Sequence, residues 1–436
     1  MLANNWKQNL HLEPTKGWLN DPNGLAYFNG KYHVFHQYSY EVNGGLKLWY
    51  YYTSSDLKNY EDHGVFLKPT IEEETHGVYS GSANKEDGKL VFYYTGNVKY
   101  KGDYDYVHAG RGHNTISFET EDGINFTEKK CLLTTDDYPN MSNHVRDPKI
   151  FEKNGKNYLV LGARDSNDYG CLLVFDKDTL KPYKTIYSEK NLGFMWECPD
   201  YFEVDGKEIF MFSPQGITRM YPNYGNMYQI GYSVVEEGIE NVDKLDNFTL
   251  LDYGHDFYAS QTFLDEDNNR VLIGWMYVPD SSYTNPTTKF GYQNCLTVPR
   301  VVNFKDGKVR QTLHKSVKDL LGNDIETNDF NKNTWYYKQE HGESFEISVA
   351  DFKVIYENKE LKVSFGTSGY GRNDRKYKLD LEDVEIVFDS SSIELFANDG
   401  SFTISTRFYP ENHDVKILAT NYVAKELGTI EIREEN

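Results

Sequence analysis

One pattern recurs five times between residues 21 and 276: an alternating run, a tight turn, and a second apolar or aromatic run. Asn-Gly and Asp-Gly turns between alternating runs are the strongest short-range signal for a β-hairpin. Consecutive turns are 58, 67, 51 and 63 residues apart. The turn positions are Gly30, Gly88, Gly155, Gly206 and Asn269. The chain must therefore place five similar β units at a repeat of about 60 residues.

This repeat leaves room for two further strands between hairpins, as in DYVHAGRGHNTISFETEDGINFTE (105–128). Regular hairpins with two outer strands each predict a five-bladed β-propeller. A β-sandwich would not need equal spacing. An α/β barrel would need helical periodicity between the hairpins, and little is present.

The chain has 436 residues, which is too long for one ordinary core, so two domains are expected. HKSVKDLLG (314–322) has helical apolar spacing and a glycine stop. Beyond it, VEIVFDSSSIELFANDGSFTISTRFYP (384–410) alternates around an Asn-Asp-Gly turn, which indicates an antiparallel sandwich. We predict an all-β chain with a propeller over 1–313, a linker with a short helix over 314–327, and a β-sandwich over 328–436.

The formal net charge is −21, so nucleic acid and anionic membranes are poor partners. The N-terminal sequence lacks the apolar run of a signal peptide, and we expect a cytoplasmic protein. The cysteines are far apart without a C-x-x-C pair, so we expect free thiols and no zinc site. They are Cys131, Cys171, Cys198 and Cys295.

One position in each hairpin lies eight or nine residues before the turn, at the predicted start of the innermost strand. These positions are Asp21, Ser80, Asp147, Glu197 and Ser260. Three carboxylates at one channel mouth raise one another's pKa, so their convergence needs a compensating use. Calcium binding is one such use and glycoside hydrolysis is another. Four tryptophans are predicted to flank this mouth and favour a sugar: Trp18, Trp49, Trp196 and Trp275.

Blocks that contain these carboxylates, and others along nearly the whole chain, resemble glycoside hydrolase family 32, the invertases, fructanases and sucrose-6-phosphate hydrolases. These blocks include GWLNDPNGL (17–25), YSGSA (79–83), HVRDPKIF (144–151), FMWECPDYF (194–202) and LDYGHDFYASQTF (251–263), and together they are highly specific. The resemblance implies a five-bladed propeller joined to a β-sandwich, which agrees with the repeat.

The resemblance also implies roles for individual residues. Asp21 would be the nucleophile, Glu197 the general acid/base, and Asp147 a stabiliser of the sugar hydroxyls. The fructosyl unit would be held by Asn20, Gln37, Trp49, Tyr79, Ser80, Arg146 and Trp275. No metal or cofactor is implied. Retaining hydrolysis predicts that the carboxyl groups of Asp21 and Glu197 lie about 5–5.5 Å apart.

The sequence departs from the family pattern at WYYYTSSDL (49–57) and GYQN (291–294). The loop over 97–113 is rich in basic and aromatic residues, and it would bind a phosphate or a second sugar, or simply be solvated.

Sucrose and sucrose 6-phosphate are the favoured substrates. Action on short fructo-oligosaccharides, as exo-fructosidase or transfructosylase, is the alternative enzyme activity, and a non-catalytic sugar-binding propeller is the alternative of another class. The sandwich is expected to stabilise the chain or to form a homo-oligomer.

Overall fold

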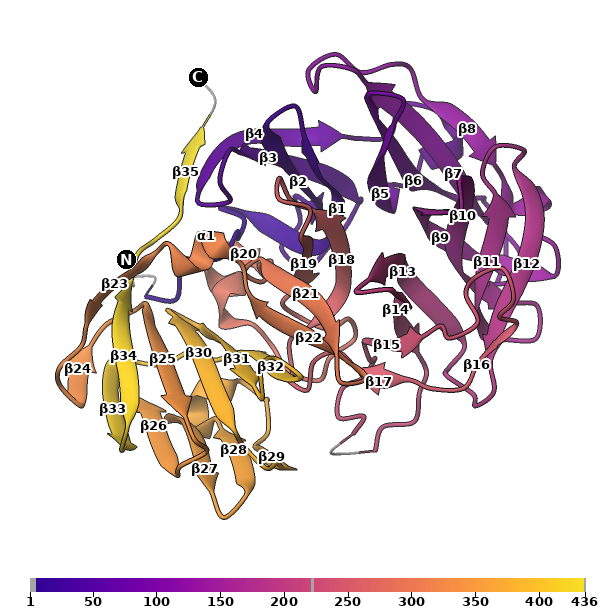
Figure 1. Cartoon of the computed structure of the whole chain (residues 1–436). Coiled ribbons are helices and arrows are strands. Elements are labelled where there is room, and N and C mark those ends of the chain that lie inside the picture. The colour runs from indigo at the N-terminus through magenta and orange to yellow at the C-terminus, as the bar shows by residue number, and fades with distance from the viewer. Residues whose placement is uncertain (1–4, 221–222, 435–436) are drawn as a thin grey trace.

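The computed structural model describes residues 5–220 and 223–434 and is all-β: a β-propeller followed by a β-sandwich (Figure 1). The first propeller sheet has the strand order β20 (Tyr292–Gln293), β1 (Gly17–Phe28), β2 (Lys31–Ser39), β3 (Leu48–Ser54), β4 (Asn59–Leu67) and β35 (Glu431–Glu434). The second has the order β5 (Val78–Glu86), β6 (Lys89–Lys99), β7 (Arg111–Thr120) and β8 (Lys130–Leu133).

The remaining propeller sheets continue in chain order. The third has the order β16 (Lys244–Leu245), β12 (Lys181–Ser188), β11 (Gly170–Asp176), β10 (Lys156–Asp165) and β9 (Met141–Lys153). The fourth has the order β13 (Met195–Val204), β14 (Lys207–Gln215), β15 (Gly231–Val234) and β17 (Thr249–Leu250). The next has the order β18 (Tyr258–Leu264), β19 (Arg270–Trp275), β21 (Arg300–Lys305) and β22 (Lys308–Leu313).

The predicted hairpins are confirmed as the antiparallel pairs β1–β2, β5–β6, β9–β10, β13–β14 and β18–β19. In the first turn, Asn29 and Gly30 have φ of 50° and 77°. Positive φ at both central residues is the type I′ geometry that matches the twist of paired strands. The first strands contact one another in the closed order β1, β5, β9, β13, β18 and back to β1. They therefore surround one central channel.

The sandwich consists of two antiparallel sheets. One has the order β23 (Leu321–Asp324), β34 (Tyr422–Leu427), β25 (Trp335–Glu340), β30 (Asp383–Asp389), β31 (Ser392–Ala397) and β32 (Phe402–Arg407). The other has the order β24 (Asp329–Asn331), β33 (Asp414–Ala419), β26 (Phe345–Val349), β27 (Phe352–Glu357), β28 (Glu360–Ser364) and β29 (Arg375–Lys378). Short 3₁₀ turns cover Glu72–Glu74, Thr135–Asp137, Pro286–Phe290 and Gly366–Gly369.

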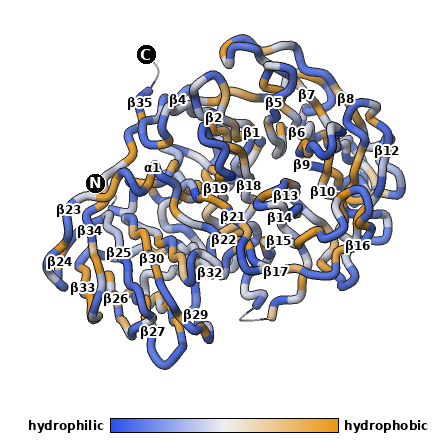
Figure 2. Tube along the Cα trace, viewed as in Figure 1, coloured by the Kyte–Doolittle hydropathy of each residue, from blue (hydrophilic) through white to orange (hydrophobic). Residues whose placement is uncertain are grey.

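Aromatic residues fill the space between sheets. Between the first two propeller sheets, the rings of Phe92 and Phe118 stack with centroids 4.7 Å apart. In the sandwich, Trp335 stacks on Phe388 at 4.0 Å. Apolar and polar residues alternate along many strands in Figure 2. Sandwich strands such as β26 and β27 bury one face in this period-2 pattern, whereas propeller strands such as β2 and β6 are buried on both faces.

The helix predicted over 314–322 is shorter than expected, because only α1 (Lys315–Lys318) is α-helical. The side chain of His314 caps it by accepting from the Ser316 N–H. Leu321 then pairs with Leu427, so residues assigned to the linker begin a sandwich strand. Strand pairing overrides the local helical spacing here. The pairing of β23 with β34 gives hydrogen-bond partners to backbone groups that would be unpaired at the end of a longer helix.

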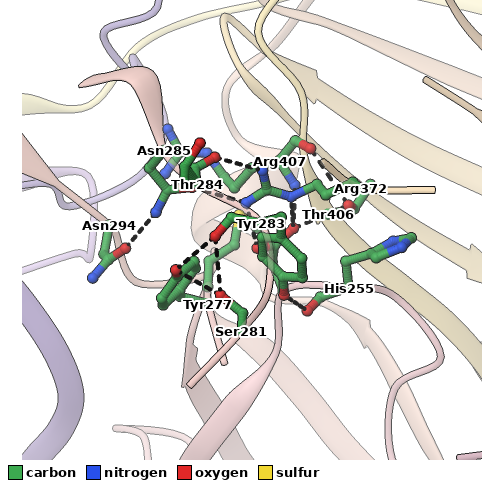
Figure 3. A network of polar contacts seen from close by, with 12 residues as sticks. His255, Tyr277, Ser281, Tyr283, Thr284, Asn285, Asn294, Arg372, Thr406 and Arg407 are labelled. Carbon is green, nitrogen blue, oxygen red and sulfur yellow. Dashed lines mark hydrogen bonds and ion pairs between the residues drawn. The ribbon is translucent and has the colours of Figure 1, made fainter. Parts of the chain in front are cut away.

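Both ends of the described chain cross between the domains. Trp6 Nε1 donates to the Pro410 carbonyl at 2.7 Å, and β35 pairs in parallel with β4 of the propeller. Figure 3 shows a further part of the interface, where the guanidinium of Arg372 from the sandwich reaches the propeller. It forms a buried bidentate ion pair with Asp256 at 2.8 and 2.7 Å. Such pairs fix the orientation of both partners.

All four cysteines are free, as predicted, and three of them are buried. Across residues 5–220 and 223–434, no helix has the length and apolarity needed to cross a bilayer.

Candidate active site

Each of the first strands carries a β-bulge near its N-terminal end. In β1, residues 20 and 21 stand opposite the single residue Gln37, because the register shifts between Leu19 and Pro22. Equivalent two-against-one shifts occur at 79–80, 147–148, 198–199 and 259–260. Bulges bend a strand and redirect its side chains, and they are common beside active sites. The residue that lies eight or nine positions before each turn is therefore at, or next to, a β-bulge in every one of these strands.

The three carboxylates do not occupy equivalent bulge positions, contrary to the shared phase predicted from the turns. Asp21 is the second bulge residue of its strand, Asp147 is the first, and Glu197 precedes its bulge. Asp147 and Cys198, the first bulge residues of β9 and β13, have left-handed φ of 62° and 47°. Spacing to the turn cannot reveal this difference, since the extra residue changes which side chain faces the channel.

Asp21 is held by its neighbours on β1 and β5. Asn20 Nδ2 donates to Asp21 Oδ1 at 3.1 Å, and Ser80 Oγ donates to Asp21 Oδ2 at 2.5 Å. Gln37 closes the ring, because its Oε1 accepts from Asn20 at 2.5 Å and its Nε2 donates to Ser80 Oγ at 2.9 Å. Charge-assisted hydrogen bonds to both oxygens fix the rotamer of the Asp21 carboxylate.

Glu197 is held at both oxygens by residues of three other strands. Arg146 donates to Oε1 from Nε at 3.2 Å and from its NH2 group at 2.7 Å. Gln215 Nε2 and the Tyr258 hydroxyl donate to Oε2 at 2.7 and 2.8 Å. The side chain of Glu197 keeps 17% of its surface exposed. The carboxyl group is thus oriented by the protein and accessible to a bound ligand.

Asp147 is connected to Asp21 through Cys198 and to Glu197 through Arg146. Its Oδ2 accepts from the Cys198 N–H at 2.8 Å, and Cys198 Sγ lies 3.7 Å from Asp21 Oδ2. Burial raises the pKa of Asp147 to about 7; Arg146 opposes this rise, whereas the charges of Glu197 and Asp21 add to it. The site therefore gathers three carboxylates from the inner strands β1, β9 and β13, and buried Arg146 pairs with two of them, Asp147 and Glu197.

The predicted aromatic residues divide into two groups. Trp49 is fully buried, and its Nε1 donates to the Tyr79 carbonyl at 3.0 Å, so it packs behind Tyr79. Trp275 contacts the rings of Trp18 and Tyr258. Its indole nitrogen is buried without a hydrogen-bond partner in the described parts of the chain.

The prediction that Trp196 flanks the mouth is wrong. Its side chain is fully buried, stacks near Phe212 with centroids 4.5 Å apart, and donates to the Leu192 carbonyl. Trp196 and Glu197 are adjacent on one strand, so their side chains point to opposite faces. The tryptophan enters the space between sheets, and the glutamate enters the channel.

Sequence analysis missed four residues of this site: Lys47, Gln215, Tyr258 and Cys198. Gln215 and Tyr258 come from the end of β14 and the start of β18, where the next sheet closes over Glu197. Lys47 Nζ donates to Asn20 Oδ1 at 2.9 Å and lies 5.3 Å from the Trp18 ring centre. Burial lowers the pKa of Lys47 to about 8, although Asp21 and Glu41 act in the opposite direction. Tyr258 lies in LDYGHDFYASQTF (251–263) and Gln215 in FSPQG (212–216), which also resembles a block of the family, and this resemblance was the available signal.

A separate cavity of about 320 Å³ opens at the other end of the first strands. Its lining includes Leu25, Lys149, Tyr201 and Thr262, each of which follows the bulge on its strand. The carboxylates do not line it. The three carboxylates therefore lie apart from this cavity, at the bulged end of the channel.

The arrangement suits acid/base and nucleophilic chemistry on a sugar. Among the described residues, no group of three or more His, Cys, Asp or Glu side chains is arranged to hold a metal ion. Two carboxyl groups with fixed orientation, beside aromatic rings and amide side chains, are the parts that retaining glycosidases use.

Comparison with known proteins agrees with this geometry. The model of the glycosyl hydrolases family 32 N-terminal domain matches residues 11–314, and that of the C-terminal domain matches 325–434. A sucrose-6-phosphate hydrolase of Staphylococcus xylosus is 32% identical over 94% of this chain and 88% of its own length. A raffinose invertase of Escherichia coli is 33% identical over 94% and 90%. The solved sucrose-6-phosphate hydrolase of Lactobacillus gasseri superposes with a TM-score of 0.86 at 27% identity, covering 98% of this chain and 94% of that one. The chain belongs to glycosyl hydrolase family 32.

Proposed function

We propose that the chain is a retaining β-fructofuranosidase that releases fructose from sucrose or sucrose 6-phosphate. The observation that carries this proposal is the pair of carboxyl groups at the bulged strand ends. Asp21 is fixed by Asn20 and Ser80, and Glu197 is fixed by donors from three strands. The relatives named sucrose-6-phosphate hydrolase and raffinose invertase support the same substrate class.

The reaction takes place in two displacements at C2 of the fructosyl unit. The Asp21 carboxylate forms a bond to C2 while the bond from C2 to the glucosyl oxygen breaks, and Glu197 gives its proton to that oxygen. Glu197 then removes a proton from water, whose oxygen bonds to C2 as the bond to Asp21 breaks. Fructose leaves with its configuration retained, and both carboxyl groups return to their starting states.

Asp147 and the surrounding polar residues hold the fructosyl unit during both steps. With its pKa raised by burial, Asp147 is suited to exchange hydrogen bonds with sugar hydroxyls. Asn20, Gln37, Ser80, Tyr79, Arg146, Trp49 and Trp275 complete the pocket, with Trp49 acting through Tyr79. The Asp21 to Glu197 carboxyl separation of about 5–5.5 Å stays a prediction of the retaining mechanism.

We propose in addition that the propeller has five blades, each begun by one of β1, β5, β9, β13 and β18. The closed order of contacts among these strands supports that number. A cytoplasmic location is supported by the four free cysteines, since thiols stay reduced in the cytosol. Self-association through the sandwich is a further proposal, and sedimentation velocity of the purified protein would test it.

Steady-state kinetics with sucrose, sucrose 6-phosphate, kestose and inulin would test the proposed activity. Fructose release from sucrose or its phosphate, with the fructosyl group trapped on Asp21 in a quenched reaction, is the expected result. Transfer products at high kestose concentration would instead favour the transfructosylase alternative. Absence of cleavage of all four sugars would overturn the proposal.

A further inference from the structure

The end of the β6–β7 hairpin carries two cations directly opposite each other. Lys99 and Arg111 are cross-strand partners in this pair of strands. Like charges in such positions destabilise a sheet, so their presence needs a compensating interaction. Lys99 is exposed and Arg111 is partly exposed. Both cations are therefore within reach of a ligand.

The protein orients the Arg111 guanidinium without neutralising it. Arg111 Nε donates to the Tyr106 carbonyl at 3.1 Å, and its NH1 group donates to Asn97 Oδ1 at 3.0 Å. Lys99 Nζ lies 5.9 Å from the centre of the Tyr106 ring. Within the described residues, neither cation lies within ion-pair distance of a carboxylate, whereas the nearby Arg164 and His108 both contact Asp168. Asp105 does not pair with either cation, and its Oδ1 accepts hydrogen bonds from the backbone N–H groups of Val107, His108 and Ala109 in its own loop.

This cationic pair is connected to the acid/base residue through a short path of contacts. Arg146, which binds Glu197, donates to His144 Nδ1 at 2.8 Å. His144 Nε2 in turn donates to the Tyr106 carbonyl at 2.9 Å, the same atom that accepts from Arg111. In the proposed reaction, the group protonated by Glu197 is the oxygen of the leaving sugar. The path therefore connects Arg111 to the carboxyl group that faces the leaving sugar in the proposed reaction.

A buried histidine links Arg111 to Tyr79, one of the residues proposed to hold the fructosyl unit. The Arg111 NH1 group lies 3.1 Å from His113 Nε2, and the His113 ring packs on Tyr79 at 5.5 Å. His113 is fully buried, and its Nδ1 has no hydrogen-bond partner in the part of the chain that the structure describes. Burial and the surrounding cations keep the pKa of His113 well below its usual value. The His113 ring is thus neutral and adds no charge beside Lys99 and Arg111.

We propose that Lys99 and Arg111 form a subsite for the phosphate of a phosphorylated leaving sugar, which makes sucrose 6-phosphate the preferred substrate. This inference rests on the proposed β-fructofuranosidase activity and specifies its substrate. A phosphate monoester carries a charge of about −1.5 to −2 at pH 7, and guanidinium and ammonium groups bind it with charge-assisted hydrogen bonds. A chain of net charge −21 repels such an anion at long range, so a local cationic subsite is required to hold it.

The ratio of kcat/KM for sucrose 6-phosphate to that for sucrose tests the subsite. We expect a ratio of at least ten in the wild type, and a loss of at least tenfold in this ratio for Lys99→Gln and for Arg111→Gln. Arg111→Lys should restore part of it. Lys101→Gln removes an exposed charge from the same loop and is the matched control, with an unchanged ratio expected. Inhibition by glucose 6-phosphate should weaken in parallel in the two Gln variants, whereas inhibition by glucose should not.

Distinct outcomes separate the two proposals. If the wild type cleaves sucrose as well as or better than its phosphate, or if both Gln variants keep the wild-type ratio, the phosphate subsite is overturned while the fructofuranosidase activity stands. A preference for kestose or raffinose that Lys99→Gln abolishes would show that Lys99 and Arg111 bind a second sugar. This result would also overturn the phosphate subsite. If no sugar is cleaved, the proposed function itself fails. Because Arg111→Gln also removes contacts to the loop, Lys99→Gln and a Tm measurement distinguish a lost charge from a lost fold.

Discussion

The side-chain amide of Asn294 donates a 2.9 Å hydrogen bond to the backbone carbonyl of Leu19, two residues before Asp21. Asn294 Oδ1 accepts from Asn285 at 2.8 Å, and Asn285 Oδ1 accepts from Arg372 and from the Tyr409 hydroxyl, each also at 2.8 Å (Figure 3). Buried amides and a sandwich arginine therefore reach the strand that carries the proposed nucleophile. Asn294 belongs to GYQN, one of the two places where the sequence departs from its family.

Removing this amide should impair positioning of Asp21. Asn294→Gly keeps the left-handed conformation at φ 73° but loses both buried hydrogen bonds. Each broken buried hydrogen bond costs about 1–3 kcal/mol, so a Tm lower by several degrees is expected. At a temperature well below that Tm, kcat for sucrose should fall severalfold with KM little changed. Asn268→Gly, in an exposed turn at φ 61°, is the matched control. An unchanged kcat in Asn294→Gly would show that Asn294 does not position Asp21.

Asp147 should make stability fall as pH rises. The folded protein keeps the Asp147 proton up to about pH 7, whereas the unfolded chain releases it near pH 3.8. Folding therefore takes up a proton between these values, and the free energy of unfolding decreases as pH rises through this window. Asp147→Asn is expected to have a Tm above that of the wild type at pH 8, with a smaller difference at pH 5, and to lose at least about 100-fold in kcat.

Calorimetry at both pH values would check this expectation. The exposed carboxylate Asp178 offers a control, since Asp178→Asn should shift neither the Tm nor its pH dependence. A Tm difference between Asp147→Asn and wild type that is the same at pH 5 and pH 8 would contradict a raised pKa.

The hairpins could be predicted from the sequence because their information is local. Asn-Gly and Asp-Gly fix the turn geometry, and period-2 alternation fixes the strands. The bulges could not be predicted in the same way. An extra residue in one strand is defined only against its partner, so counting from the turn placed Asp147 and Glu197 in the same phase as Asp21, which the register does not support.

The rest of the site depends on contacts between distant segments. Tyr258 meets Glu197 because two neighbouring sheets converge there, although the two residues are 61 positions apart in the sequence. Gln215 lies closer, on the paired strand β14 of the same hairpin, where it stands opposite Met195. The helix expected over 314–322 ends early because Leu321 pairs with Leu427, more than a hundred residues later. Local propensity cannot report such long-range pairing.

The proposed acid/base role of Glu197 predicts a dependence on the leaving group. Glu197→Gln should lower kcat/KM for sucrose by about 10²–10⁴, because the glucosyl oxygen leaves poorly without a proton. The loss should be much smaller for 4-nitrophenyl β-D-fructofuranoside, whose phenolate leaves unprotonated. The second displacement lacks its base, so a burst of nitrophenolate equal to the enzyme concentration is expected. Glu203→Gln, an exposed site on the same strand, should behave as wild type. An equal loss with both substrates would argue against proton donation by Glu197.

The stability of the interface between propeller and sandwich should depend on pH through His11. This buried side chain lies between two carboxylates, with Nδ1 2.8 Å from Asp389 Oδ2 and Nε2 2.8 Å from Glu394 Oε1. Burial lowers its pKa, but the hydrogen bonds and charges of Asp389 and Glu394 outweigh burial and raise the pKa to about 9. The protonated ring donates to both carboxylates, so its contribution to stability is fully present below pH 6.5 and is lost as pH rises through 9.

His11→Gln removes this charge and leaves two buried carboxylates facing a single amide. Breaking a buried charged network costs about 3–5 kcal/mol, so the Tm should fall by several degrees at pH 6.5, with a smaller deficit above pH 9. His413→Gln is the matched control, because this buried histidine hydrogen-bonds the backbone carbonyl of Ser390. Thermal melts between pH 6 and 10 measure both variants. The wild type should lose Tm relative to His11→Gln across this range, and parallel curves would show that His11 carries no proton at the domain joint.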